Sequence, residues 1–319
     1  MTHHISLASG GACLAVHAGF WHELERYARG QHFKNRVGSY SGSSAGAVIG
    51  TLQALHVPAS VIVDDIRQGG GLKGHFPRLR ALAVYLGLRK SMYDGNVYLN
   101  RLQKLCNKTT TRRPPLPMTV ALTDVNMKQR CLTFVKKEGL LNATVASASI
   151  PYLLNARHVA PIGMCVDGSL TRASFPTDIV IKHLRTQRSG SIVLINCMPW
   201  PTYRAHQNAV NVKSMALTWD NVLKSHNLEP IIRMFSPPLQ FQDGVFSVQV
   251  GRRNGQLVRS RNGALHVTFV APTQAQFQQF GGMASVSNLS WKAGDSAIES
   301  MIQTGRFMAR QFLNSGACR

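Results

Sequence analysis

The pattern in the sequence with the clearest chemical potential is Gly-Ser-Ser-Ala-Gly at residues 42–46, which fits G-x-S-x-G. In such a turn a strand reverses sharply into a helix and lifts the central serine into the open. Gly42 and Gly46 are needed because a side chain at either position would collide across the turn. The spacing selects Ser44, and not Ser43, as a nucleophile. A five-residue match is weak by itself, so its weight depends on the rest of the chain.

Two further segments hold what a nucleophilic serine needs. Residues 5–20, ISLASGGACLAVHAGF, place a turn of small residues before a helix, where backbone N–H groups can point at a developing oxyanion. A plain strand-to-helix turn is the alternative, and a dinucleotide-binding loop is disfavoured because the G-x-G-x-x-G spacing is absent. Residues 166–169, VDGS, contribute Asp167. Because an Asp-Gly pair alone usually marks only a turn, the ordered set of three motifs carries the prediction.

Strands and helices alternate around these motifs. A strand at residues 5–8 leads through a glycine turn into a helix at 16–28, and a second strand at 37–41 leads through the elbow into a helical stretch at 47–57. This alternation predicts an α/β fold with a parallel sheet covered on both faces. An α/β-hydrolase reaches its elbow only after several strands, so a serine that follows two strands predicts a different strand order.

The second half of the chain predicts further strands. Residues 118–125 and 131–135 flank a polar turn and predict a hairpin, whereas 191–197 are continuously apolar, as in a buried central strand. Between 243 and 272, alternating segments are separated by two Asn-Gly dipeptides, which favour tight hairpin turns. They predict an antiparallel meander whose last strand can return to the main sheet. A helix at 296–313 closes the chain.

The charge balance is unusual, with 36 Lys and Arg against 14 Asp and Glu and a formal net charge of +22. Such a surface attracts polyanions, and both anionic lipid headgroups and nucleic acid are candidates. The cations occur as scattered pairs, Arg112-Arg113, Lys136-Lys137 and Arg252-Arg253, without a long block or interleaved aromatic residues. This distribution favours a generally solvated positive surface and does not favour nucleic acid.

The cysteines and histidines indicate neither a disulfide framework nor a metal site. The six cysteines are Cys13, Cys106, Cys131, Cys165, Cys197 and Cys318. They have no C-x-x-C spacing, which predicts reduced intracellular thiols. His17 and His22 lie five positions apart on a predicted helix, off a common face, and the pair His3-His4 is interpreted as a disordered start of the chain.

The sequence contains no signal peptide and no apolar stretch long enough to cross a bilayer, so any membrane contact is expected to be peripheral and the location intracellular, in the cytoplasm or at a membrane surface. Residues 79–88 are apolar and flanked by cations, which suits either an interfacial helix or an ordinary packed helix. No linker or repeat interrupts the chain. We therefore expect one domain over 1–319, with the core motifs within 5–200 and the closing strands and helix in 201–319.

With its three motifs in this order, the chain resembles the patatin-like phospholipase family, which has a glycine-rich loop, G-x-S-x-G and then D-G-A or D-G-G. Residues 145–176, VASASIPYLLNARHVAPIGMCVDGSLTRASFP, resemble the segment around the family's catalytic aspartate. Residues 115–134, PLPMTVALTDVNMKQRCLTF, resemble the preceding hairpin. VTFVAP at 267–272 and MIQTGRFMARQFL at 301–313 resemble the closing strand and helix, so the resemblance covers nearly the whole chain.

The resemblance implies a three-layer α/β/α fold with a mainly parallel central sheet and a Ser-Asp dyad without histidine. Ser44 would attack an ester carbonyl of a phospholipid or other acyl lipid, and Asp167, followed by Gly168, would act as general base. The oxyanion hole would be formed by the backbone N–H groups of Gly10, Gly11 and Ala12. Water would release the acyl-enzyme, and the scheme requires no metal and no cofactor.

The chain departs from the family's pattern in the loop. The family reads G-G-G-x-R/K-G where this chain has residues 9–14, SGGACL, so the first and last glycines and the basic residue are absent. Backbone donors survive such changes, but the Cβ of Leu14 can reshape the loop, which affects rate and substrate fit more than reaction class. Ser169 in place of Ala or Gly is a smaller change.

Two functions compete on this basis. The first is a phospholipase A or lysophospholipase recruited to anionic interfaces by its charge. The second is an inactive scaffold that binds anionic membrane, nucleic acid or an acidic partner. Retention of both Ser44 and Asp167 favours the enzyme. A Ser-Asp-His triad stays open, since four histidines follow Asp167 in the sequence: His183, His206, His226 and His266.

Overall fold

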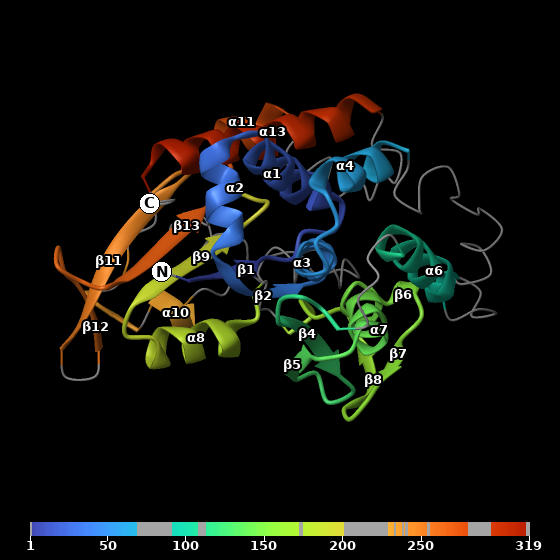
Figure 1. The fold of residues 1–319 in the computed structure, drawn as a ribbon. Helices are drawn as coiled ribbons and strands as arrows, with labels where there is room; N and C mark the ends of the chain where they lie inside the picture. Colours follow the sequence, from blue (N-terminus) through green and yellow to red (C-terminus); the bar gives the residue numbers. More distant parts are fainter. Residues whose placement is uncertain are drawn as a thin grey trace, which may run out of the picture.

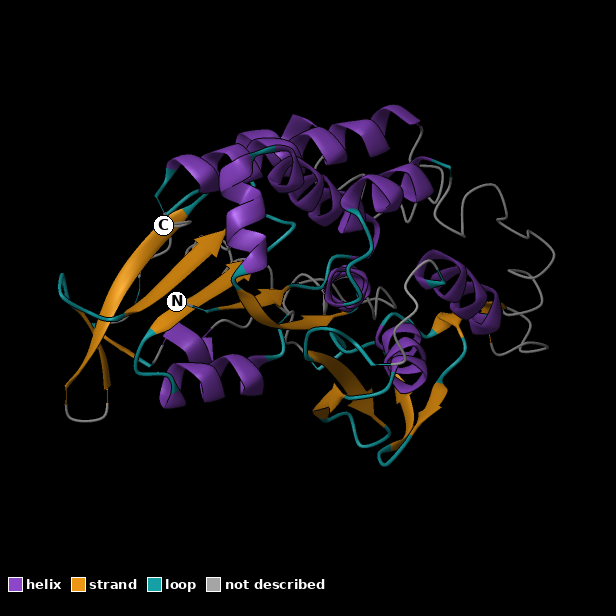
Figure 2. Cartoon of the chain, in the orientation of Figure 1, coloured by secondary structure: helices purple, strands orange, loops and turns teal. Residues whose placement is uncertain are grey.

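The computed structural model describes residues 2–68, 91–107, 113–171, 175–200, 229–232, 234–237, 239, 242–253, 256–279 and 295–316 of the 319. A mixed sheet runs through the molecule with helices on both of its faces (Figures 1 and 2). This is the three-layer α/β/α arrangement that the family resemblance implies.

The centre of the sheet is parallel, in the order β13-β9-β1-β2-β4. These strands span Leu265–Val270 (β13), Gly190–Ile195 (β9), His3–Leu7 (β1), Val37–Ser43 (β2) and Met118–Asp124 (β4). The strands predicted at 5–8, 37–41, 118–125 and 191–197 all lie here, so the predicted parallel sheet is confirmed.

Strand β9 explains why both faces of the sheet are covered. Val193 and Ile195 pack into the hydrophobic cluster beneath the helices of one face, whereas Ile192 and Leu194 pack into the cluster on the other. Successive side chains of a strand point to opposite faces, so a continuously apolar strand needs a helix layer on each side. The first layer contains α1 (Leu14–Arg26), α2 (Ala28–Asn35), α4 (Ala59–Arg67) and α13 (Asp295–Asn314), and the second contains α8 (Thr177–Thr186) and α10 (Glu229–Ile232) (Figure 1).

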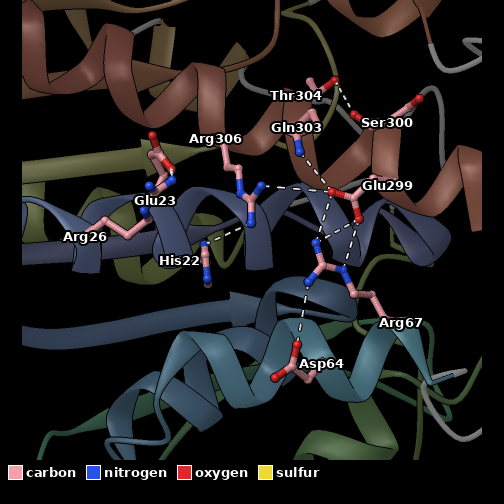
Figure 3. A network of polar contacts seen from close by, with 10 residues as sticks. All are labelled: His22, Glu23, Arg26, Asp64, Arg67, Glu299, Ser300, Gln303, Thr304 and Arg306. Atoms are coloured by element: carbon pink, nitrogen blue, oxygen red, sulfur yellow. Dashed lines mark hydrogen bonds and ion pairs between the residues drawn. The ribbon is translucent and has the colours of Figure 1, made fainter.

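Helices α1 and α13 pack with their backbones in contact. A Cβ on Gly19 would lie 2.1 Å from the carbonyl oxygen of Ile302, and one on Gly305 would lie 2.0 Å from that of Val16. An ion pair also joins α13 to α4, because Glu299 of α13 accepts hydrogen bonds from Arg67 of α4 (Figure 3). The predicted closing helix at 296–313 is confirmed, and the helix predicted at 16–28 ends at Arg26, before an extended Tyr27.

A second group of elements lies beside β4. Strand β5 (Gln129–Phe134) pairs antiparallel with β4 and confirms the predicted hairpin. The apolar run at 151–165 divides into β6 (Tyr152–Leu154), β7 (Arg157–Val159) and the start of β8 (Gly163–Val166). β6 pairs with β3 (Ser91–Tyr93) in a small sheet. The helices here are α3 (Ala45–Ala54), α6 (Gly95–Cys106) and α7 (Lys137–Ser147).

The C-terminal strands are antiparallel as predicted, and β13 returns to the main sheet beside β9. Their order differs from that of a simple meander. β11 (Phe246–Arg253) lies between β12 (Gln256–Arg259) and β13, and β12 also pairs with β10 (Phe235–Ser236). The chain crosses β11 at Gly263, where a Cβ would lie 2.3 Å from the carbonyl oxygen of Val250, so glycine permits the crossing.

The expectation of a disordered start at His3 and His4 is wrong. Both residues belong to β1 and are buried. The His4 ring hydrogen-bonds to Ser39 and Ser41 and stacks on His183 with ring centroids 3.8 Å apart. Burial lowers the pKa of both rings, that of His3 to about 4, so neutral imidazoles fit a strand covered on both faces.

The described ranges include most of the cysteines. Five cysteines are described there, all as free thiols, and Cys318 lies outside. No described group of three or more His, Cys, Asp or Glu side chains can hold a metal ion. In the same residues, no helix combines the length and apolar character that a membrane span requires. The apolar stretch at 79–88 lies outside the described residues.

Candidate active site

The candidate site lies where two strands meet head to head along β4. β2 pairs with one edge of β4 as far as Ser43, which lies opposite Ala121. On the same edge, β8 then pairs with β4, with Val166 opposite Thr123, and β5 pairs with the other edge. Because β2 and β8 approach from opposite directions, the next residue of each, Ser44 and Asp167, lies opposite Leu122. Topology therefore joins two residues that are 123 positions apart in sequence.

Ser44 forms the sharp turn between β2 and α3. Its φ of 50° and ψ of −120° are uncommon for a residue with a side chain and store strain of about 1–3 kcal/mol. The glycines on either side permit the turn. A Cβ on Gly42 would lie 2.4 Å from the carbonyl oxygen of Gly46, and one on Gly46 would lie 2.3 Å from that of Leu7. Both glycines of the motif are therefore required for steric reasons.

Ser44 and Asp167 are in direct contact. Ser44 Oγ donates to Asp167 Oδ2 at 2.7 Å, and both residues are buried. The other carboxylate oxygen, Oδ1, accepts from the backbone N–H of Ser169 at 2.9 Å and from its hydroxyl at 2.6 Å. The carboxylate is thus held in one orientation with one oxygen on the serine hydroxyl, an arrangement suited to accept its proton.

Burial raises the pKa of Asp167, and the hydrogen bonds from Ser169 and Ser44 oppose that rise only in part. Every donor is a neutral hydroxyl or amide, and no cation of the described residues contacts this carboxylate. A carboxylate without a neighbouring positive charge keeps its basicity. This is the electrostatic setting that a general base needs.

Residues that the motifs did not identify hold the pair in place. Ser147 Oγ accepts the backbone N–H of Ser44 at 2.9 Å and donates to the carbonyl of Ala121 at 2.6 Å. Thr123 Oγ1 donates to the carbonyl of Asp167 at 2.7 Å. Both are buried polar side chains, in α7 and β4. The one signal in the sequence is a hydroxyl within an apolar segment, which is too common to single them out.

Gly168 is confined by its neighbours. A Cβ there would lie 2.2 Å from the carbonyl oxygen of Ala121, and the Gly168 N–H donates to the carbonyl of Ser147 at 3.2 Å. The glycine of the Asp-Gly motif is thus a packing requirement of the turn after β8. Ser169, which follows it, is buried and bonded to the carboxylate.

The candidate oxyanion loop follows β1 and adjoins the elbow. Gly46 at the start of α3 packs on the carbonyls of Leu7 and Ala8, so the loop and the elbow share one edge of the sheet. Gly11 has a φ of 51°, and Ala12 lies in the short 3₁₀ helix η1 (Gly11–Cys13). In the described residues the backbone N–H groups of Gly10 and Gly11 have no acceptor. Free donors at a helix start can hold an anion.

Contacts of this loop involve the retained Gly10 and two altered positions, Ser9 and Leu14. A Cβ on Gly10 would lie 2.0 Å from Cys197 Sγ, and that thiol donates to the carbonyl of Ser9 at 3.3 Å. Leu14 begins α1 with helical dihedral angles and packs against the core. Its side chain therefore joins the helix layer, and its backbone angles do not require glycine.

Neither His183 nor His266, the described histidines that follow Asp167, hydrogen-bonds to its carboxylate. His183 hydrogen-bonds to Gln187 and stacks on the ring of His4, and His266 contacts Gln249. His206 and His226 are outside the described residues.

Comparisons with known proteins bear on this arrangement. A family model described as patatin-like phospholipase matches residues 5–181, just over half of the chain. No curated protein matches. The solved structure of VipD from Legionella pneumophila aligns with a TM-score of 0.34 and 13% identity over 61% of this chain and 50% of its own. This chain therefore matches about half the length of VipD.

Proposed function

This chain belongs to the patatin-like phospholipase family, and on that premise we propose that it is a phospholipase A or lysophospholipase with Ser44 as nucleophile and Asp167 as general base. Membership of the family supports lipid acyl hydrolase activity in general. The finer assignment rests on the site itself.

In the proposed reaction, Asp167 Oδ2 takes the proton of Ser44 Oγ as the oxygen attacks the ester carbonyl. The carbonyl oxygen becomes an oxyanion, which the free N–H groups of Gly10 and Gly11, with that of Ala12, stabilise. The tetrahedral intermediate then expels the alcohol, which leaves with the proton from Asp167. A water molecule attacks the acyl-serine with Asp167 again as base, and the fatty acid is released.

One observation carries the proposal: the 2.7 Å hydrogen bond from Ser44 Oγ to the buried carboxylate of Asp167, which no cation of the described residues contacts. A strained serine between two sterically required glycines supports it, because folded proteins retain such strain mainly at functional positions. A serine that only capped a helix would need neither a left-handed backbone nor a buried carboxylate partner.

The test is covalent labelling by a fluorophosphonate ester together with hydrolysis of a soluble short-chain ester. Ser44→Ala is expected to abolish both. Ser43→Ala is the matched control, since Ser43 precedes it in the same turn and its hydroxyl has no partner among the described residues. Absence of labelling in the wild-type protein would refute the proposal.

The same assays decide between a dyad and a triad. We expect Asp167→Asn to lose hydrolysis, and His183→Ala, His206→Ala, His226→Ala and His266→Ala each to retain it. Loss of activity in one histidine variant, with Asp167→Asn still active, would replace the dyad by a histidine-dependent mechanism.

The net charge of +22 supports a peripheral contact with anionic membrane. The same charge equally supports a second candidate, an inactive scaffold that binds anionic membrane, nucleic acid or an acidic partner. The altered loop positions Ser9 and Leu14 favour this candidate. Wild-type protein that binds anionic vesicles or nucleic acid but neither labels nor hydrolyses esters would establish that candidate.

A further inference from the structure

We propose that two neighbouring hairpin turns, residues 125–128 between β4 and β5 and residues 160–164 at the start of β8, form a docking surface for an anionic phospholipid bilayer. We name this surface the twin-turn surface. It deepens the function proposed above, and rests on it, by naming the face through which the site would reach a lipid interface.

The two turns lie side by side at the catalytic edge. Since Asp124 pairs with Cys165, the register brings Val125 opposite Met164, and both turns extend beyond the carboxyl end of β4 (Figure 1). Met164 is three residues before Asp167 along β8. A surface that touched lipid here would therefore adjoin the Ser44–Asp167 pair.

The side chains on these turns are apolar and open to solvent. Val125 is 74% exposed, Met127 58% and Met164 45%, although turns normally carry Gly, Asn, Asp or Pro. Met127 also has a φ of 56°, a left-handed conformation that disfavours a long side chain. Local conformation therefore does not explain a methionine at this position, whereas insertion into an apolar phase would.

The β4–β5 turn is held rigid by one carboxylate. Asp124 Oδ1 accepts the backbone N–H groups of Asn126 and Lys128, at 2.9 and 3.0 Å, and Oδ2 accepts from Arg130 at 2.8 Å. Hydrogen bonds to backbone N–H groups and Arg130 lower the pKa of Asp124, so it stays ionised. The apolar side chains are thus presented on a preformed turn, which reduces the ordering cost of binding.

The charges around the surface select the occupant. Asp124 is the single acidic residue in segments 124–130 and 157–164, and Arg130 bonds to it. The Lys128 side chain is exposed and its ammonium group has no partner among the described residues, and Arg157 and His158 flank the second turn. Apolar side chains with Lys128, Arg130 and Arg157 nearby fit the boundary between acyl chains and anionic headgroups.

The experiment measures sedimentation with vesicles of phosphatidylcholine, with and without phosphatidylglycerol. The triple variant of the twin-turn surface, called the tip variant, carries Val125→Ser, Met127→Gly and Met164→Ser. Glycine is chosen at 127 because it suits the left-handed backbone there and should not disturb the fold. The matched control is Val97→Ser with Val135→Ser, two exposed valines on α6 and at the far end of β5. Soluble short-chain ester hydrolysis and thermal unfolding check the fold of each variant.

We expect the tip variant to lose at least about tenfold in partitioning onto anionic vesicles, because three apolar side chains no longer leave water. The control is expected to bind as wild type, and Lys128→Glu to weaken binding only when phosphatidylglycerol is present. Equal binding of tip variant and wild type, equal losses in tip and control variants, or no vesicle binding by the wild type would each overturn the docking surface.

The two proposals fail separately. Hydrolysis of the soluble ester with tip-independent vesicle binding would leave the hydrolase standing and remove the docking surface. Tip-dependent binding without ester hydrolysis would keep the docking surface and remove the hydrolase.

Discussion

Two buried carboxylates, Glu23 on α1 and Asp167 after β8, have opposite electrostatic surroundings. Glu23 accepts hydrogen bonds from Arg310 of α13 and from Arg26 and Tyr27, so it fastens the α1–α13 pair (Figure 3 shows its place on α1). In the part of the chain that the structure describes, the Asp167 carboxylate accepts only from two hydroxyls and an amide. Both are at most 1% exposed, so burial does not distinguish them and the partners do.

The partners set opposite pKa shifts. Burial by itself would raise the pKa of Glu23, but the hydrogen bonds and charges of Arg310 and Arg26 outweigh it and the pKa is lowered. Burial raises the pKa of Asp167, and neutral donors do not reverse that. Of the three buried carboxylates in the described residues, the third, Asp124, also bonds to an arginine. Within the described residues no Lys or Arg contacts Asp167, although the whole chain has 36 of them.

The largest expected effect at either carboxylate is the loss of activity in Asp167→Asn. We expect kcat/KM for a soluble ester to fall by about 10²- to 10⁴-fold, since the variant loses its proton acceptor. The free energy of unfolding at neutral pH should stay the same or rise, because the amide removes a buried charge and can still accept from Ser169. Urea unfolding and steady-state kinetics measure the two quantities. A variant that stays active would show that the carboxylate is not the base.

The converse change, Glu23→Gln, should affect stability and leave the chemistry intact. Loss of the charge-assisted hydrogen bonds from Arg310 and Arg26 is expected to lower the free energy of unfolding by about 1–3 kcal/mol. Glu299→Gln is the matched control, since Glu299 also pairs with an arginine but joins α13 to α4. It is 40% exposed, so its loss should stay below about 1 kcal/mol. Urea unfolding of the three proteins measures this, and a selective loss of kcat in folded Glu23→Gln would contradict a purely structural role.

The pH dependence of stability should have opposite signs at the two sites. The pKa of Glu23 is lower in the folded state than its ordinary value of 4.5, so its contribution is present above that value and is lost as pH falls. The pKa of Asp167 is raised above 3.8, so stability is lost as pH rises from 3.8 through the folded value. Urea unfolding of each variant against wild type across acidic pH measures both slopes. If the free energies of unfolding attributed to Glu23 and Asp167 changed with pH in the same direction, the hydrogen-bond partners of the two carboxylates would not determine their pKa shifts.

The sequence predicted the elements around Asp167 better than it predicted the residue's environment. The G-x-S-x-G elbow, the strand at 118–125 and the hairpin after it follow from local rules of turn sterics and apolar alternation. The hydrogen bonds of Ser147 and Thr123 do not, because they depend on β8 meeting β2 along β4, which no local pattern encodes. The roles of Ser44 and Asp167 in catalysis stay predictions until they are assayed.

The failures in prediction have the same origin. His3-His4 looked like a polar chain start, but position in the centre of the sheet buries both rings and keeps them neutral. The crossing at Gly263, which places β11 between β12 and β13, depends on close backbone contact with Val250. Glu23 was not singled out at all, since its arginine partner Arg310 is 287 residues away. Long-range contacts, and not local propensity, decide each case.

The smallest expected effect concerns Ser169, which stands where the related family has Ala or Gly. Its hydroxyl donates to Asp167 Oδ1 at 2.6 Å and holds the pKa of the carboxyl below the value that burial alone would give. Ser169→Ala should therefore raise that pKa further and move the acidic limb of the kcat/KM profile to higher pH, with the plateau rate little changed. Ser169→Thr keeps a hydroxyl and should restore the wild-type profile. An unmoved limb in Ser169→Ala would contradict this prediction. It would mean that the backbone N–H of residue 169 alone sets the pKa of the Asp167 carboxyl and that the hydroxyl contributes nothing to it.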